Sequence, residues 1–365
     1  MPAIHQLVAG FNLGDAISNE ARTLRRLFQG WGCASEIFSE RQRILPQLRR
    51  EARDAATAVQ VVQPDDIVLL HLSTGSPVNE IFRQLRCRKA LLYHNITPPE
   101  FFRDMNAPVA AQLAQGREQV QALAGVAAVN LAVSAFNATE LEALGYAQVG
   151  VLPLVLDFAA LRAAPDSGRL ARYADGLTNI LFVGRGVPNK RLEDVLAAFF
   201  YFQKFVEPNS RLIHAGSYAG LENYQALLRT HIHQLQLANV EFTGSIPQSE
   251  LNACYQSAHV FLCSSEHEGF CIPLIEAMVN EVPILAYAAG AVPETLAGAG
   301  VLIKEKRFDL IAEMLGRLVH DAALRNAVLA QQRERLALYE HRDLETELRA
   351  HLAPLLEPST GNRPR

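Results

Sequence analysis

Two glutamates eight positions apart, Glu268 and Glu276, frame the part of this 365-residue sequence that is best suited to chemistry. Pro273, between them, is favoured in the first turn of a helix, and Gly269 is favoured in a loop. We therefore expect Glu268 on the loop after a strand at His259–Ser264, and Glu276 inside the helix that follows. The spacing predicts two carboxylates that reach one site from a loop and from a helix.

The backbone between these carboxylates predicts an anion site. Amides of the loop around Phe270 and Cys271 would open a helix N-terminus, where unpaired N–H groups and the helix dipole favour phosphate. Glu268 beside that site can take the hydroxyls of a sugar, and Glu276, one turn into the helix, can take a ribose. The alternative is a loop glutamate and a surface helix glutamate that share no role.

The whole stretch 268–278 resembles the E-x7-E motif of retaining glycosyltransferases of family 4, which have the GT-B fold. The pattern in that family reads E-G-F-x-x-P-x-x-E-A-M, and this sequence matches it at every fixed position. The resemblance implies that the loop Gly269–Cys271 and Glu276 bind the donor, and that Glu268 is a catalytic residue that positions the donor sugar.

A basic segment at residues 182–190 resembles a second motif of the same family, F-V-G-R-x-x-x-x-K. It lacks the Gly-Lys-Ser/Thr ending of a Walker A loop. The resemblance implies that Arg185 and Lys190 grip the nucleotide diphosphate. Breaking a glycosyl–phosphate bond adds negative charge to the leaving group, and fixed cations stabilise that charge in the transition state. Two solvated basic residues on a turn are the alternative.

Two histidines end expected strands of the N-terminal half. His94 closes the strand expected at Lys89–His94, and His71 lies in the strand expected at Asp66–Leu72. The family carries a histidine beside the reacting sugar at the position of His94, which makes His94 a catalytic candidate. His71 is an acceptor-side candidate, and a structural role is the alternative for both.

The loop after the first expected strand contains Gly14 and Asp15. Gly14 lets the backbone approach a ligand closely, and Asp15 either caps the next helix or meets an acceptor hydroxyl. The family usually has adjacent glycines in this loop, and here Asp15 takes the second position. We assign both residues to the acceptor side.

Two segments of the C-terminal half resemble donor-binding parts of the family. Ala289–Thr295 resembles a G-x-x-P-E loop near the nucleotide, in which Glu294 is either a donor contact or a helix-start residue. The exit of the strand expected at Val240–Gly244 resembles the segment beside the nucleotide base. Gly244 there is either donor-binding or part of an ordinary turn.

Short apolar runs alternate with helical patterns along the chain, which predicts parallel sheets. The expected strands are Ile4–Ala9, Cys33–Ser39, Asp66–Leu72, Lys89–His94 and Val126–Ser134, and then Asn179–Gly184, Arg211–Gly216, Val240–Gly244, His259–Ser264 and Pro283–Tyr287. Continuous apolar runs such as Ile180–Val183 are typical of strands buried on both faces. Two such series predict two doubly wound domains.

We expect an α/β protein of the GT-B class, with two Rossmann-like domains that face an interdomain cleft. Residues 1–152 form the acceptor-side domain, residues 153–338 the donor-binding domain, and residues 339–357 a C-terminal helix that returns to the first domain. Residues 358–365 are expected to be a disordered tail. Ligands of open parallel sheets bind beyond the carboxyl ends of the strands, where the motif residues lie.

Composition excludes several classes of function. A net charge of −4 gives no overall attraction to nucleic acid. The five cysteines show no zinc-ligand spacing, and their odd number suits a cytoplasmic protein. We expect no signal peptide and no membrane span. An arginine-rich stretch, Arg41–Arg53, is either a solvated face or a contact with a polyanion or with the inner face of a membrane.

The resemblance implies transfer of a hexosyl unit from a UDP-, GDP- or ADP-sugar to a hydroxyl of a glycan or lipid-linked acceptor, with retention at the anomeric carbon. No Asp-x-Asp tripeptide occurs, so we expect a site without a metal or other cofactor. Polysaccharide or lipid-linked glycan synthesis is the expected setting. Two alternatives remain: another GT-B reaction (a phosphorylase or a nucleotide-sugar epimerase), and a non-catalytic partner subunit.

Overall fold

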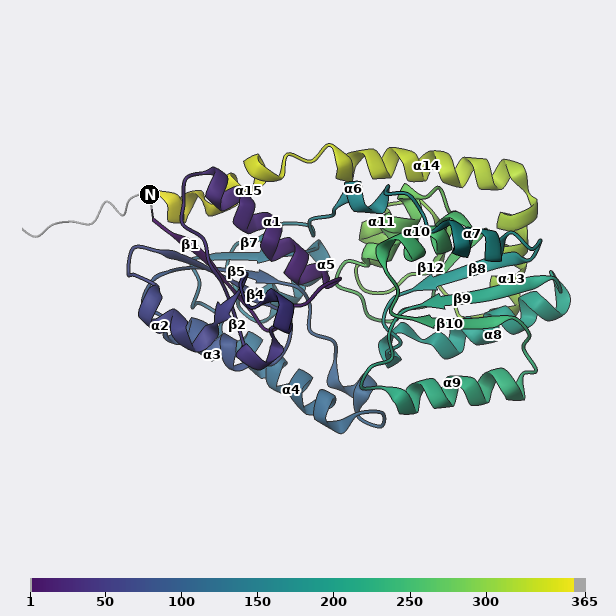
Figure 1. Ribbon diagram of the computed structural model, residues 1–365, viewed down its shortest axis with the longest axis horizontal. Coiled ribbons are helices and arrows are strands. Elements are labelled where there is room, and N and C mark those ends of the chain that lie inside the picture. Colours follow the sequence, from purple (N-terminus) through teal and green to yellow (C-terminus); the bar gives the residue numbers. More distant parts are fainter. Residues whose placement is uncertain (1, 358–365) are drawn as a thin grey trace, which may run out of the picture. The chain divides into compact units, whose positions relative to one another are not determined.

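The computed structural model describes residues 2–357, which form two compact units. The first unit contains residues 2–99, 108–156 and 343–357, and the second contains residues 100–107 and 157–342. Each unit is a parallel β-sheet with helices on its faces (Figure 1). No described helix is long and apolar enough to cross a membrane. The tail expected from residue 358 lies outside the described residues.

The first unit is built on a seven-stranded sheet in the order β3-β2-β1-β4-β5-β6-β7. Every neighbouring pair is parallel. Its strands are β1 (Ile4–Val8), β2 (Ile37–Ser39), β3 (Arg53–Asp54), β4 (Ile67–Leu72), β5 (Arg88–Tyr93), β6 (Val129–Ala132) and β7 (Val149–Val151). All residues of β1 and β4 are buried, as expected for central strands covered on both faces.

Among the described residues, five α-helices of the first unit lie between successive strands along the chain, and a sixth comes after all of these strands. They are α1 (Ala16–Gly30), α2 (Ala58–Val61), α3 (Pro77–Gln84), α4 (Ala107–Ala122), α5 (Ala135–Ala143) and α15 (Leu344–Leu356). Helix α15 comes from the far end of the chain and packs on β5 and β6. Arg88 Nη1 donates to Leu355 O at 2.6 Å, and Trp31 Nε1 donates to Glu345 Oε1 at 2.9 Å. These bonds tie the C-terminal helix into the first unit.

The second unit has a six-stranded parallel sheet in the order β10-β9-β8-β11-β12-β13. Its strands are β8 (Thr178–Val183), β9 (Ser210–Ala215), β10 (Val240–Gly244), β11 (Val260–Cys263), β12 (Ile284–Tyr287) and β13 (Val301–Ile303). Its helices are α6 (Phe158–Leu161), α7 (Ser167–Tyr173), α8 (Leu192–Phe205), α9 (Glu222–Gln234), α10 (Gln248–Gln256), α11 (Ile272–Val279), α12 (Val292–Leu296), α13 (Phe308–His320) and α14 (Ala322–Glu340).

The predicted fold class is confirmed, because both units are doubly wound parallel sheets. Each expected strand is present, although the strand expected at Cys33–Ser39 is reduced to Ile37–Ser39. Three short strands, β3, β7 and β13, were not predicted from the sequence, and they extend the sheets at their edges. None of these three contains a fully buried residue, so their apolar pattern is weak.

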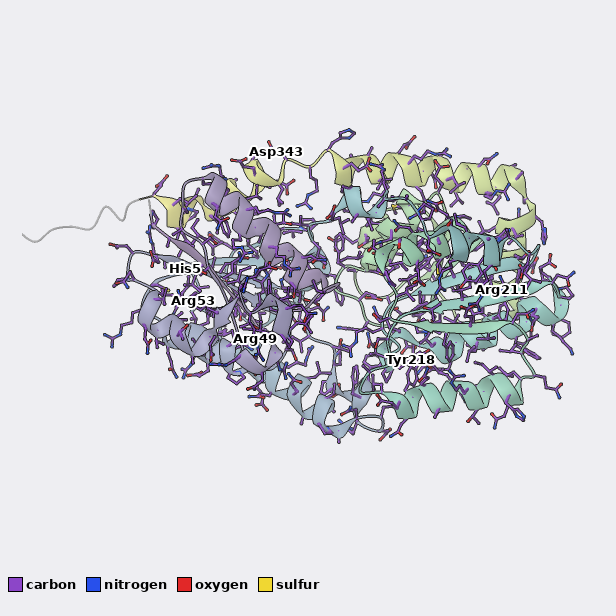
Figure 2. The ribbon with its side chains drawn as sticks, viewed as in Figure 1. His5, Arg49, Arg53, Arg211, Tyr218 and Asp343 are labelled. Carbon is purple, nitrogen blue, oxygen red and sulfur yellow. The ribbon has the colours of Figure 1, made fainter. Side chains whose placement is uncertain are left out.

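The arginine-rich stretch forms two 3-10 turns, Arg41–Arg43 and Pro46–Leu48, followed by β3, rather than an amphipathic helix. Its apolar residues Ile44 and Leu48 belong to a buried cluster with Phe11. Arg53 lies over the ring of Phe38 at 5.8 Å, and both Arg49 and Arg53 belong to the first unit (Figure 2). The stretch therefore presents its arginines without an apolar face beside them.

The strand orders place the candidate residues. In each sheet the winding reverses at one point, between β1 and β4 in the first unit and between β8 and β11 in the second. Loops beyond the carboxyl ends of the strands on either side of such a point form the usual ligand site of an open α/β sheet. Arg185 and Lys190 follow β8, and Glu268 follows β11.

Candidate functional site

Hydrogen bonds join the loop after β8 to the loop after β11. Ser264 Oγ donates to the carbonyls of Lys190 and Arg191, at 3.0 and 2.8 Å. Asn189 Nδ2 donates to His267 O at 3.0 Å, and Glu266 N donates to Asn189 O at 2.9 Å. Two motifs that are far apart in sequence therefore form one surface.

Lys190 and Glu268 meet on that surface as an ion pair, with Lys190 Nζ 2.5 Å from Glu268 Oε1. Both side chains are largely buried, at 17% and 8% exposure. Burial alone would lower the pKa of Lys190, but the charge and hydrogen bond of Glu268, together with smaller effects of Cys271 and Cys263, outweigh it, and the pKa is raised. The ammonium group therefore stays charged at neutral pH and is held in place beside a carboxylate.

A glycine shapes the backbone at Glu268. Gly290 has φ +57°, and a Cβ there would lie 2.6 Å from the carbonyl oxygen of Glu268. The amide of Ala291 donates to that same oxygen at 2.9 Å. The segment predicted to lie near the nucleotide thus packs on the Glu268 loop through its glycine.

Glu294, from the same segment, lies one turn further along in α12 and faces different groups. Its charge adds to burial in raising the pKa of Tyr339 on α14, and Arg335 Nη2 donates to its backbone oxygen at 2.9 Å. The loop around Gly290 reaches the Lys190–Glu268 pair, whereas the described contacts of Glu294 lie toward α14.

Helix α11 begins as the sequence predicts, with Pro273 in its first turn and Glu276 inside it. Cys271 precedes it with φ +70°, a left-handed conformation that is uncommon for residues other than glycine. Among residues 2–357, the amides of Phe270 and Cys271 have no hydrogen-bond acceptor. Two free N–H donors at a helix N-terminus are suited to an anion.

Glu276 has one oxygen engaged, since Tyr255 Oη donates to its Oε2 at 2.7 Å. Burial raises the pKa of Glu276, and the hydrogen bond from Tyr255 opposes that shift without cancelling it. Tyr255 was not predicted from the sequence. It orients Glu276 and leaves its other oxygen for a partner.

Arg185 is exposed, and its side chain makes no hydrogen bond or ion pair with residues 2–357. The loop that carries Arg185, by contrast, is held in place by two residues that were not predicted from the sequence. His214 Nε2 bonds to Gly184 O at 2.9 Å, and Tyr218 Oη bonds to His214 Nδ1 at 2.8 Å. Burial lowers the pKa of His214 to about 4, so it acts as a neutral bridge.

The ring of Tyr218 also lies against the next residue of that loop. A Cβ on Gly186 would be 2.0 Å from this ring, which explains the glycine there. Tyr218, marked in Figure 2, belongs to the same unit as Arg185. His214 lies near the carboxyl end of β9, and this position in the sequence could have predicted that it supports the site.

Gly244 ends β10 and lies near the same loop through Gly216 and Ala215. It forms an isolated backbone bridge with Gly216, next to Ala215, whose carbonyl accepts from the amide of Gly184 at 3.0 Å. The described structure thus brings Gly244 close to the Arg185 loop but gives it no direct contact with the ion pair.

In the first unit, Asp15 caps α1. Its Oδ2 accepts from the amide of Ser18 at 2.8 Å and from the Ser18 hydroxyl at 2.6 Å. Gly14 beside it is exposed with φ +67° and has open space around it. The described contacts match the capping alternative for Asp15, and its contact with an acceptor stays a prediction.

His71 and His94 lie together at the carboxyl ends of β4 and β5, with His71 Nδ1 3.0 Å from His94 Nε2. Glu20 of α1 lies beside them, and Gln6 of β1 contacts His71. Burial, with a smaller effect of His71, holds the pKa of His94 well below its usual value. Neither Gln6 nor Glu20 was predicted.

Within residues 2–357, two groups of side chains have ligand atoms close enough to share a metal ion. One is Glu20, His71 and His94, and the other is Cys263, Glu268 and Cys271. In the second group, the carboxylate is already neutralised by Lys190 at 2.5 Å. That group therefore fits a metal poorly as it stands.

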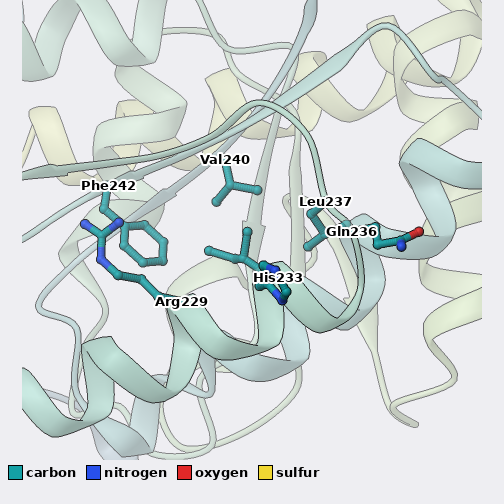
Figure 3. A pocket seen from close by; sticks show the side chains of 7 residues that line it. Arg229, His233, Gln236, Leu237, Val240 and Phe242 are labelled. Carbon is teal, nitrogen blue, oxygen red and sulfur yellow. The ribbon is translucent and has the colours of Figure 1, made fainter.

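A hollow of about 510 Å³ lies elsewhere in the second unit, between α9 and the edge strand β10 (Figure 3). Its lining residues are Arg229, Ile232, His233, Gln236, Leu237, Val240 and Phe242. Arg229 lies over the ring of Phe242 at 5.5 Å. None of the predicted site residues lines it, so it is separate from the Lys190–Glu268 surface.

Known proteins resemble part of this chain in sequence. Residues 173–335 match the family described as glycosyl transferases group 1. A GDP-mannose:cellobiosyl-diphosphopolyprenol alpha-mannosyltransferase of Xanthomonas oryzae is 31% identical over 196 residues, which are 49% of this chain and 51% of that protein. A GDP-mannose-dependent alpha-mannosyltransferase of Mycolicibacterium smegmatis is 32% identical over 170 residues, 43% of this chain and 40% of that protein. The chain thus spans about half or less of these relatives.

Solved structures resemble the whole chain. A sucrose-phosphate synthase from Thermosynechococcus elongatus has a TM-score of 0.76 at 18% identity and covers 97% of this chain, with 99% of its own length matched. HepE of Anabaena, solved with UDP and glucose, has a TM-score of 0.71 at 16% identity, over 97% of this chain and 100% of its own. At these identities the likeness establishes the GT-B fold. The fold and the family match together support a glycosyltransferase.

Proposed function

We propose that the protein is a retaining glycosyltransferase of family 4 that transfers a hexosyl unit from a nucleotide-diphosphate sugar to a hydroxyl acceptor. The observation that carries the proposal is the surface where the loops after β8 and β11 join. It combines the Lys190–Glu268 ion pair, an exposed cation at Arg185 and the free amides of Phe270 and Cys271. Cations and amide donors suit a diphosphate, and a buried carboxylate beside them suits sugar hydroxyls.

In this proposal the diphosphate binds to Arg185, Lys190 and the loop Gly269–Cys271. Glu268 accepts hydrogen bonds from the hydroxyls of the donor sugar, and Glu276 takes the ribose. The bond between the anomeric carbon and the phosphate oxygen breaks, while the acceptor oxygen bonds to the same face of that carbon. The acceptor proton passes to the leaving phosphate, whose charge is stabilised by the fixed cations.

We assign the acceptor side to the first unit, with His94, His71, Gly14 and Asp15 as its candidate residues. The acceptor is a glycan or a lipid-linked glycan in the cytoplasm. The printed name of the Xanthomonas relative, which includes a diphosphopolyprenol acceptor, supports this class of substrate.

For the donor we propose a mannosyl nucleotide. Several relatives of this chain are named as mannosyltransferases, two of them with GDP-mannose in the name. Thermal unfolding with UDP, GDP or ADP tests this proposal, because a ligand at about 100 times its dissociation constant stabilises by roughly 2.7 kcal/mol. GDP should raise the unfolding temperature most. A protein that no nucleoside diphosphate stabilises would contradict the donor site itself.

Retention and independence of metal have tests of their own. Hydrolysis of GDP-mannose followed by proton NMR should release the sugar first in the anomeric configuration of the donor. Transfer should persist after exhaustive chelation, because Arg185 and Lys190 supply the positive charge that a metal would otherwise provide. Activity that disappears and returns with magnesium or manganese would refute that part of the proposal.

A further inference from the structure

A buried polar array extends across three adjacent strands of the first unit. Gln6 is on β1, His71 is on β4, and His94 directly follows β5. Glu20 reaches the array from α1. The side chains of Glu20 and His71 are fully buried, and that of His94 is 3% exposed. Because every proton in such an array needs a partner, its hydrogen bonds define where the protons are.

The side-chain amide of Gln6 determines which ring nitrogen of His71 carries a proton. Its Nε2 donates to the carbonyl of Ala21 at 2.9 Å, so its Oε1 is the atom that faces His71 Nε2 at 3.0 Å. An amide oxygen only accepts, so His71 carries its proton on Nε2. In the neutral ring Nδ1 is then an acceptor, and the atom 3.0 Å away, His94 Nε2, donates to it.

His94 is therefore protonated on Nε2, and its Nδ1 holds a lone pair. The pKa of His94 is well below the usual value because of burial, so the ring is neutral at physiological pH. His94 Nδ1 has no hydrogen-bond partner among residues 2–357 and is buried. A buried acceptor without a partner costs roughly 1–3 kcal/mol, which a donor that reached it would recover.

Glu20 supports the same arrangement by its charge rather than by a hydrogen bond. Its Oε2 lies 3.5 Å from His94 Nε2 and 3.6 Å from His71 Nδ1, beyond ordinary hydrogen-bond length. Its other oxygen accepts from the amide of Val155 at 3.3 Å, which fixes the carboxylate. A carboxylate beside the two facing nitrogens attracts the proton that they share.

We propose that Gln6, His71 and Glu20 are positioning residues that hold His94 as the Nε2–H tautomer, so that its Nδ1 accepts a hydrogen bond from a substrate hydroxyl. The inference rests on the proposed function for the identity of that substrate. It also makes His94 selective, since a hydroxyl can donate to Nδ1 and an ether oxygen or a fluorine cannot. A substrate in which fluorine replaces the hydroxyl that donates to His94 Nδ1 is expected to react about tenfold more slowly. This change corresponds to the loss of one net hydrogen bond.

The tautomer is measured directly by NMR of the full chain labelled with ¹⁵N in histidine, with His94 assigned from the spectrum of His94→Gln. We expect a protonated Nε2 and an unprotonated Nδ1, and no titration between about pH 6 and 8. Gln6→Leu removes the acceptor for His71 Nε2–H and should mix the tautomers of His94. His233→Gln, an exposed change in the other unit, should leave the His94 signals unchanged.

Kinetics supply the second readout. His71→Ala should lower kcat about tenfold without changing the affinity for nucleoside diphosphate. His71→Asn should recover most of the rate, because the Asn carbonyl oxygen can replace Nδ1 as the acceptor. A proton found on His94 Nδ1, or equal rates for His71→Ala and the parent, would overturn the proposal. A metal ion at one equivalent in the purified protein, lost in His71→Ala, would also overturn it. The NMR result does not depend on turnover, so it stands apart from a failure of the proposed function.

Discussion

At the scale of single residues, Arg185 and Lys190 carry the same charge in different settings. Arg185 is exposed and unpaired among the described residues, whereas Lys190 is paired with Glu268 at 2.5 Å. A site that binds a diphosphate needs charge that is free to move toward the ligand and charge that is already in place. The two residues supply one of each kind, and this difference makes their substitutions distinguishable.

Alanine at each position should weaken binding of nucleoside diphosphate and lower turnover by at least about a hundredfold, since one transition-state contact is worth roughly 3 kcal/mol. Only Lys190→Ala should also lower stability, by about 1–3 kcal/mol, because it leaves the buried Glu268 without a partner. Isothermal titration, transfer assays and urea unfolding measure the three effects. Arg333→Ala, which removes an exposed ion pair with Glu281, is the matched control. Two variants with parental affinity and turnover would refute the diphosphate assignment.

Substitutions of Glu268 and Glu276 should also have effects that can be told apart. Glu276→Gln should weaken the binding of free nucleoside diphosphate, because Glu276 is proposed to hold the ribose. Glu268→Gln should leave that binding nearly intact and lower transfer, because its proposed partner is the donor sugar. Calorimetry with the nucleoside diphosphate and an assay with the full donor distinguish them. The reverse pattern would mean that the roles are exchanged.

At the scale of elements, the sequence predicted where the motif residues lie but not what supports them. Pro273 and Gly269 predicted the loop and helix around Glu268 correctly, because both residues restrict the backbone locally. The supports come from distant strands. Only the fold brings His214 and Tyr218 to Gly184. A single sequence holds no record of such contacts.

The position of Glu20 in the sequence could have predicted a buried polar contact, but it was not used. Glu20 lies on the buried face of α1 with Ala21, Leu24 and Phe28, which follow it by one, four and eight positions. A carboxylate on an otherwise apolar stripe predicts a polar partner inside the protein. The edge strand β7 offered no such signal, because Val149–Val151 is half-buried and contains a glycine.

Packing of the Gly290 loop against Glu268 gives a prediction at this scale. Gly290→Ala places a Cβ 2.6 Å from the Glu268 carbonyl oxygen, so the Glu268 loop must move and transfer should fall about tenfold or more. Gly298→Ala is the matched control, since Gly298 also has positive φ (+90°) but has nothing within 4 Å. Both variants carry the backbone strain, and only the first carries the clash. Equal activity in the two would show that the contact does not position Glu268.

At the scale of the whole molecule, two series of strands and helices in the sequence predicted two parallel sheets correctly. The division of the chain is less simple than that pattern. Residues 100–107 belong to the second unit although they precede most of α4, and residues 343–357 belong to the first. Apolar periodicity gives the type of an element, and the unit to which it belongs depends on contacts that are remote in sequence.

Buried histidines give the molecule a predictable response to acid. His214 is expected to titrate near 6.5 in the unfolded chain and near 4 in the folded one. Between these values the unfolded state binds more protons, so the free energy of unfolding falls as the pH drops from about 6.5 to 4. Burial also lowers the pKa of His5, His94 and His259, so these residues also lower the free energy of unfolding as the pH falls. His214 alone should contribute on the order of 3 kcal/mol across this window.

Urea unfolding at pH values from 7.5 to 4 tests this response. Because His214 lies in the second unit, its effect is measured on the unfolding transition of that unit. Carboxylates whose pKa is lowered, such as Glu80 and Asp175, lose their contribution only below about pH 4.5. Glu276, whose pKa is raised by burial, opposes the histidines above that pH, so the effect of His214 is read from the difference between the parent and His214→Gln. His214→Gln cannot take up a proton and should flatten the curve above that pH, even if its stability at pH 7.5 is lower. His233→Gln, an exposed change, should keep the parental slope. Equal slopes for the parent and His214→Gln from pH 7 down to 4.5 would contradict a neutral, buried His214 and with it the bridge that holds the Arg185 loop.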